Sequence, residues 1–115
     1  EKFLTLPNYF LIDSQVAGQS VKLREVKFDK PGFVVVRELK DNEPGTTLGF
    51  SAIVPQGSAQ NVKVAITLKL DPAKSYIAEL HDDTDGDTKF NIKKDLLLVN
   101  PENGEAIRKT FTVGQ

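Results

Sequence analysis

The residues most suited to chemistry form one acidic stretch, His81-Asp-Asp-Thr-Asp-Gly-Asp87. Four aspartates lie within six positions of it, and carboxylates at this density repel one another unless water or a hard cation compensates them. Asp83, Asp85 and Asp87 have the alternate spacing with which calcium loops direct carboxylates at one ion. The helix-loop-helix form is excluded, because glycine stands at the fourth place instead of the sixth and Lys94 replaces the required glutamate. We therefore predict that Asp83, Asp85 and Asp87 bind calcium. The alternative is a solvated turn in which Asp and Gly are present for its backbone geometry.

His81 is the single histidine of the chain. A catalytic zinc site needs about three nitrogen or carboxylate ligands, to which His81, Asp82 and Asp83 would contribute. The alternative, which we favour, is a hydrogen bond from His81 across the loop. No serine lies in a nucleophile-elbow glycine frame, no second imidazole is available as a base, and glycine-rich phosphate loops are absent. We therefore predict no catalytic residues and no enzymatic activity.

Length and composition narrow the class of protein further. A chain of 115 residues has about the length of one domain and can bury a core. Its net charge of -1 argues against a nucleic-acid partner. The lack of cysteine excludes disulfides, zinc–thiolate sites and iron–sulfur clusters within the chain. The chain begins at Glu1 without a signal peptide or an apolar spanning run, so we expect a processed product or an excised domain with no membrane insertion.

Apolar and polar residues alternate along most of the chain, as they do in half-buried strands, and no run has helical periodicity. A change of phase at Arg24-Glu25 predicts a bulge, and turn signals occur at 30–32, 41–45 and 100–104. The predicted strands cover residues 10–12, 21–28, 33–39, 48–54, 62–70, 76–80, 96–99 and 107–113. This pattern predicts an all-β fold, an antiparallel immunoglobulin-like β-sandwich of about 7–8 strands.

Short motifs occur in a fixed order along the chain: Asp13-Ser-Gln15 with Gly18, Pro31-Gly-Phe-Val-Val-Val36, Leu48-Gly-Phe-Ser51, Gly57 with Asn61-Val62, Tyr76-Ile-Ala-Glu-Leu-His81 with Asp83, Gly86 and Phe90, and Gly104 with Phe111-Thr-Val113. In order and spacing they resemble an uncharacterised surface-protein domain family of archaea and bacteria, domain of unknown function 7282. The resemblance implies a β-sandwich on a cell surface and no established activity. The chain departs from many members at Arg37-Glu38, where they carry a histidine, and from the strong acidity of halophilic members.

The amino-terminal residues 1–8 lie outside this resemblance, and residues 9–115 form the predicted sandwich domain. Phe3, Leu4 and Leu6 make the extension apolar, so it needs a surface to cover. It could add to the edge of its own sheet or cover its own core. The sharper prediction is a donor strand that adds to a neighbouring subunit, because strand addition links sandwiches through main-chain hydrogen bonds.

The sequence therefore predicts a non-enzymatic extracellular or cell-surface structural protein. Its most specific form is a self-assembling filament or surface-layer subunit, a homo-oligomer or polymer joined by β-strand addition. The alternative is a calcium-binding adhesion or ligand-binding module of a larger surface protein, with the ion held by the turn at residues 83–87. Apart from calcium, no cofactor is predicted.

Overall fold

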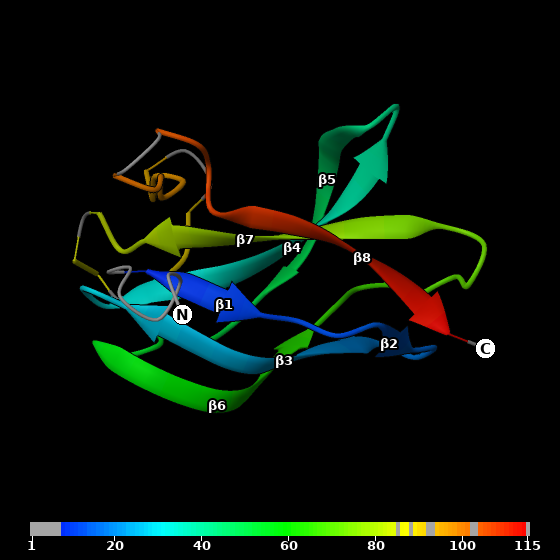
Figure 1. Cartoon of the computed structure of the whole chain (residues 1–115), viewed down its shortest axis with the longest axis horizontal. Coiled ribbons are helices and arrows are strands. Elements are labelled where there is room, and N and C mark those ends of the chain that lie inside the picture. The colour runs from blue at the N-terminus through cyan, green and yellow to red at the C-terminus, as the bar shows by residue number, and fades with distance from the viewer. Residues whose placement is uncertain (1–7, 85, 88, 92–93, 102–103, 115) are drawn as a thin grey trace.

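The computed structural model in Figure 1 describes residues 8–84, 86–87, 89–91, 94–101 and 104–114. Within these residues the regular elements are strands: β1 (Tyr9–Leu11), β2 (Gln15–Val16), β3 (Ser20–Phe28), β4 (Gly32–Lys40), β5 (Glu43–Phe50), β6 (Gly57–Ala65), β7 (Ser75–Asp82) and β8 (Arg108–Gly114). The described part of the chain contains no helix long and apolar enough to cross a membrane.

The strands form two sheets that enclose the core. One sheet has three strands in the order β1-β3-β6, and the other has five in the order β2-β8-β7-β4-β5. Neighbouring strands are antiparallel, except that β2 pairs in parallel with the end of β8. Because β1 and β2 follow one another but lie in different sheets, the chain changes sheets between Leu11 and Gln15. The predicted all-β, sandwich-like architecture of about eight strands is confirmed.

The change of phase expected near Arg24 is present in β3. Leu23 and Val26 are both fully buried although they lie three positions apart, so the strand presents a new set of residues to the core after Arg24. The pairing of β3 with β6 omits Arg24 and Asn61, and Asn61 has a positive φ of 56°. Arg24 and Asn61 thus lie opposite each other outside the ladder, and the register is the same on either side of them.

The turn predicted over residues 41–45 is shorter in the structure. Asp41 and Asn42 have positive φ values of 53° and 64°, and Lys40 pairs directly with Glu43. A two-residue turn with both central residues at positive φ matches the right-handed twist of a hairpin, and Asn and Asp tolerate that conformation. β5 therefore begins at Glu43 and includes Pro44, which is acceptable because β5 is an edge strand.

Other segments also differ from the sequence predictions. β6 covers Gly57–Ala65 instead of 62–70, because the chain leaves the three-stranded sheet after Ala65 and Thr67 donates to Leu48 beside the other sheet. Residues 96–99 form isolated bridges instead of a strand. The short strand β2 was not predicted, since two residues carry too little periodicity to be recognised.

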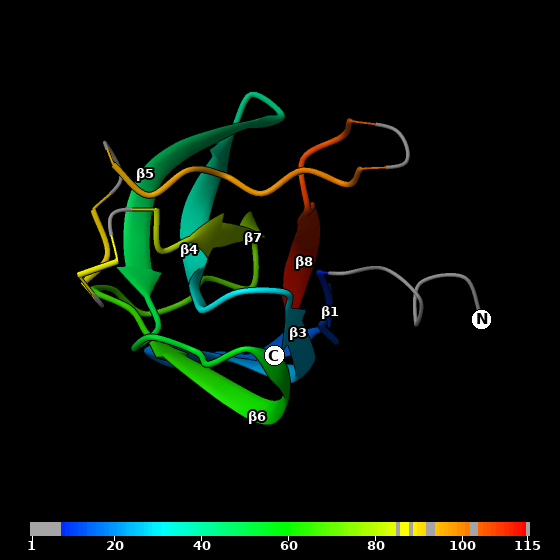
Figure 2. The same ribbon diagram turned by 90° about the vertical axis from the view of Figure 1, so that its left-hand side faces the viewer.

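β7 is buried on both of its faces. Tyr76, Ala78 and Leu80 face the core between the sheets, as the alternation predicts. The alternate residues Ile77, Glu79 and His81 are also almost inaccessible to solvent. They lie on the outer face, which the connection between β7 and β8 crosses on the side away from the three-stranded sheet (Figure 2). The fold thus places ionisable residues beneath one of its own loops.

Candidate functional site

A buried pair, Glu79 and His81, occupies the outer face of β7. Nε2 of His81 lies 3.0 Å from Oε1 of Glu79, and Nδ1 lies 3.0 Å from the backbone oxygen of Asp95. The hydrogen bond that we predicted from His81 across the loop is therefore confirmed. Both ring nitrogens contact protein groups, so a metal ion or a substrate would have to displace one of these contacts to reach the imidazole.

The partners of the pair indicate its charge state. A carbonyl oxygen only accepts hydrogen bonds, so Nδ1 of His81 must be the donor to Asp95. Nη1 of Arg37 lies 3.5 Å from Oε1 of Glu79, and Nη1 of Arg108 lies 3.9 Å from Oε2. Burial on its own would raise the pKa of Glu79, but the hydrogen bond from His81 and the charge of Arg37 outweigh it and hold that pKa below its ordinary value. Glu79 is then a carboxylate, and His81 donates to it from Nε2.

Asp95 fastens the connection that covers this pair. Its carboxylate accepts hydrogen bonds from the backbone of Thr84 at 3.1 Å and from the backbone of Asn91 at 2.6 Å. Since the backbone oxygen of the same residue accepts from His81, Asp95 joins both sides of the loop to β7. The arrangement favours a structural role for this polar group, because Glu79, His81 and Asp95 are almost inaccessible to solvent.

Phe90 completes the cover with aromatic contacts. Its ring centroid lies 5.3 Å from that of His81, 5.5 Å from that of Phe33 and 4.9 Å from that of Phe50. The contacts with His81 and Phe33 are edge-to-face and the contact with Phe50 is tilted, and aromatic contacts at these distances add to the gain from burial. Through Phe90 the connection therefore touches β4, β5 and β7.

The described residues of the acidic turn hydrogen-bond within the protein. The backbone of Asp83 donates to Pro31 at 3.2 Å and accepts from Gly86 at 3.1 Å, while the carboxylate of Asp87 accepts from the backbone of Lys89 at 2.9 Å. Asp85 lies outside the described residues. Within the described part of the chain, no group of three or more His, Cys, Asp or Glu side chains could hold a metal ion. Calcium at Asp83, Asp85 and Asp87 therefore stays a prediction.

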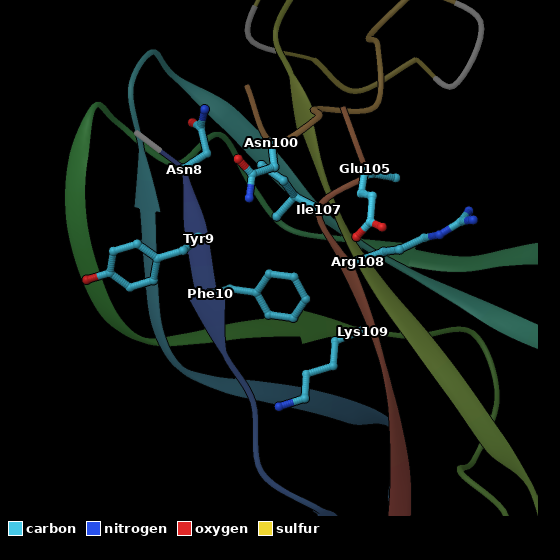
Figure 3. Close-up of a pocket in the computed structure, with 9 residues that line it drawn as sticks. Asn8, Tyr9, Phe10, Asn100, Glu105, Ile107, Arg108 and Lys109 are labelled. Atoms are coloured by element: carbon cyan, nitrogen blue, oxygen red, sulfur yellow. The ribbon is translucent and has the colours of Figure 1, made fainter. Parts of the chain in front are cut away.

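The predicted donor residues Phe3, Leu4 and Leu6 also lie outside the described residues. The described chain starts at Asn8, whose side-chain oxygen accepts a hydrogen bond from the backbone of Asp29 at 2.8 Å. Beside it lies a groove of about 210 Å³ between β1 and the region that leads into β8 (Figure 3). Its lining residues are Asn8, Tyr9, Phe10, Asn100, Glu105, Ala106, Ile107, Arg108 and Lys109.

Sequence reasoning missed Arg37, Glu79 and Asp95 as members of the buried polar group, and it missed the groove. One signal was present: Glu79 interrupts an apolar strand whose inward residues, Tyr76, Ala78 and Leu80, were recognised. A carboxylate on the second face of a core strand would have indicated a covering segment, but the sequence does not reveal which segment supplies its partners.

These features define a two-sheet β domain with a covered outer face and a groove beside its first strand. The family model of the domain of unknown function DUF7282 matches residues 9–113, which is nearly the whole chain, and the chain therefore belongs to this family. The predicted family is thus confirmed, and the match begins after the amino-terminal extension. No curated protein matches the chain, and no solved structure matches it.

Proposed function

We propose that this domain is a non-enzymatic, extracellular structural protein: a subunit of a self-assembling cell-surface filament or surface layer. Subunits are joined when residues 1–8 of one copy add as a β-strand to another copy. The extracellular setting is the one that the family resemblance implies. The described residues place no nucleophile, base and accessible cavity together, and this distribution favours a structural role over a catalytic one.

One observation carries the proposal. The amino-terminal segment joins the domain at Asn8, beside a groove with an apolar part formed by Phe10, Ala106 and Ile107. Phe10 and Ile107 are half-buried and pack against the core, so an apolar strand placed there would extend that core. An apolar segment and an apolar groove within one chain are the two components that strand addition requires.

We also propose that the sandwich is of the immunoglobulin type. The orders β1-β3-β6 and β8-β7-β4-β5 correspond to strands A, B and E and to G, F, C and C′ of that fold. The hydroxyl of Tyr76, near the start of β7, accepts a hydrogen bond at 2.9 Å from the backbone of Asp71, five residues upstream. This contact has the form of the tyrosine corner found at the start of strand F. Such sandwiches serve widely as building blocks of surface proteins, which supports the structural role.

The test compares the intact chain with a variant that lacks residues 1–7 and keeps Asn8. Negative-stain electron microscopy and light scattering after size-exclusion chromatography should show polymers of the intact chain and monomers of the shortened one. A second variant with Phe3, Leu4 and Leu6 all changed to Ser keeps the length of the segment and should also be monomeric. The proposal is wrong if the intact chain is monomeric at high concentration, or if the shortened chain assembles equally well.

The second candidate function is a calcium-dependent adhesion module. It is favoured by the position of the acidic turn, which packs against the β3–β4 turn and borders a cavity of about 410 Å³ lined by Lys30, Pro31, Asp82, Asp83, Thr84 and Gly86. An ion that binds only the folded state stabilises it by mass action. The melting temperature should then rise with millimolar calcium and lose this rise in Asp83→Asn, and an unchanged melting temperature removes the candidate.

A further inference from the structure

The groove beside Asn8 lies between two strand edges that have no strand partner on that side within the described part of the chain. β1 pairs with β3 on its other side. β8 pairs with β7 on one side, and on the other it meets β2 only at Val113 and Gly114. The first part of β8 therefore has an open edge, and Figure 3 shows β1 beside it. An open edge is a template for pairing with another segment.

The register of β8 identifies the backbone groups that face the open edge beside the groove. The backbone of Leu80 donates to Ile107 at 3.1 Å, so this pair belongs to the hydrogen-bonded set of the antiparallel ladder. Because hydrogen-bonded pairs alternate, Lys109 and Phe111 also direct their backbone groups towards β7. The N–H and C=O of Thr110 then point to the opposite side, into the open edge. A strand added to β8 would pair with Thr110 first.

The amino-terminal segment matches this edge in length and pattern. Seven residues precede Asn8 and span about 23 Å when extended. The open edge of β8 runs from Arg108 to Thr112, so the segment is long enough to cover it. In a strand, Leu4 and Leu6 lie on one face and Phe3 on the other. Leu4 and Leu6 can therefore cover the apolar part of the groove. Pro7 lacks an N–H and ends the segment that can pair.

Residues 1–7 of a second copy can fill the groove more readily than residues 1–7 of the same copy. Asn8 is held by the backbone of Asp29, and Tyr9 already pairs with Lys27 in β1. To enter its own groove, the chain would have to reverse through Pro7 and Asn8, which leaves at most six residues, some of them needed for the turn. A neighbouring copy can deliver all seven without a reversal.

We propose that the edge of β8 around Thr110, together with the apolar groove against β1, is the acceptor site for residues 1–7 of a second copy of this chain. The inference rests on the proposed assembly and deepens it, because it names the surface that receives the strand. Assembly of this kind is directional: each copy receives a strand at its own groove and donates its segment to the next. Such head-to-tail contacts generate open filaments or closed rings.

The test is Thr110→Pro in the intact chain, with Thr110→Val as the matched control. Proline removes the N–H of Thr110, which faces the open edge, and leaves the hydrogen bonds of Lys109 and Phe111 to β7 in place, since proline is tolerated on the open side of an edge strand. Valine keeps the N–H and the β-branched shape. We expect Thr110→Pro to be monomeric in light scattering and Thr110→Val to assemble as the unchanged chain does. Thermal unfolding of the shortened chain with and without Thr110→Pro shows whether the substitution preserves the fold.

A second measurement keeps the inference testable if Thr110→Pro fails to fold. A synthetic peptide of residues 1–7, added to the chain that lacks them, should shift backbone amide signals of β8 and β1 in NMR spectra. A peptide in which Phe3, Leu4 and Leu6 are all changed to Ser should leave these signals unchanged. Shifts confined to another edge would overturn the assignment.

The outcomes separate this inference from the proposed function. If loss of residues 1–7 abolishes assembly but Thr110→Pro assembles normally, strand addition stands and the acceptor is another surface. If the intact chain stays monomeric at high concentration, the proposed assembly itself fails. The intact chain could be monomeric and lose more melting temperature on Thr110→Pro than the shortened chain does. Residues 1–7 would then fill the groove of their own copy, and a second copy is excluded as the donor.

Discussion

The outer face of the five-stranded sheet and the open edge of β8 are neighbouring surfaces that differ in what covers them. Above the outer face, the connection between β7 and β8 supplies Asp95 and Phe90, which contact His81 directly. At the edge of β8, the described residues supply no strand over most of its length. The first surface is thus covered by the chain itself, whereas the second is an open strand edge within the described residues. A connection anchored on a buried polar group therefore covers one surface of the domain and leaves the neighbouring strand edge open.

Removal of the carboxylate beneath the connection should destabilise the outer face most. Glu79→Ala should lower the free energy of unfolding by about 3–5 kcal/mol, because it leaves His81 and the nearby arginines without their buried counter-charge. Urea unfolding followed by circular dichroism measures the loss. Glu43→Ala, at an exposed site on β5, is the control and should change stability by less than about 0.5 kcal/mol. Equal effects of the two substitutions would show that the outer face is not held by its charges.

Phe90→Ala should open the cover and leave the core intact. We expect a loss of about 2 kcal/mol, because contacts with three rings disappear although Phe90 is only partly buried. Hydrogen exchange should become faster at the amide of Asp82, which donates to Leu96, and stay slow at core residues such as Val34. Leu96→Ala is the control, since that side chain is 63% exposed. Unchanged exchange at Asp82 would mean that Phe90 does not fasten the connection.

Tyr76→Phe tests a contact on the other face of the same strand. The substitution keeps the ring, which stacks on Phe111, and removes the hydroxyl that accepts from the backbone of Asp71. A single hydrogen bond of this kind contributes about 1 kcal/mol, and water can reach the exposed Asp71 afterwards. Thermal unfolding should show this small decrease. A loss as large as that of Glu79→Ala would contradict the view that the outer face depends more on polar contacts than the inner one.

The smallest expected effect is a pH dependence that comes from Glu79. Its pKa in the folded protein lies below the ordinary value of 4.5, so between the two values the unfolded chain binds more protons. The stability from Glu79 is therefore fully present above pH 4.5 and is lost as the pH falls through the lower folded pKa. Melting temperatures measured from pH 6 to pH 3 should fall less steeply in Glu79→Gln. Identical slopes in the two proteins would show that Glu79 does not contribute to acid unfolding.

The part of the fold that sequence could predict is the part set by side-chain alternation. Val34 and Val36, or Ala78 and Leu80, alternate with residues of the other face, and this pattern identifies strands and their core side because strand geometry has a period of two. The alternation does not predict strand boundaries that are set by backbone conformation. Asp41 and Asn42 form a two-residue turn, so β5 begins earlier than Pro44 and Gly45 indicated.

The site was less predictable for a different reason. The acidic turn was conspicuous because its residues are neighbours in sequence, although Asp83 also bonds to Pro31 and Thr84 to Asp95 and Leu96. The group around Glu79 draws Arg37, His81, Asp95 and Arg108 from four separate segments. Partners so far apart are brought together only by the pairing of β4, β7 and β8, and periodicity does not encode that pairing.

The parallel pairing of β2 with β8 has a mechanical consequence. β1 begins and β8 ends at opposite sides of the molecule in Figure 1, and β2 runs in the same direction as β8. Tension applied through these two ends would draw β2 and β8 past each other along their length. The hydrogen bonds between Gln15, Val16 and the end of β8 would then be loaded together in shear instead of opening one after another. Under such a pull the lifetime of the domain is set by its rate of unfolding, and the β2–β8 pairing bears part of the load.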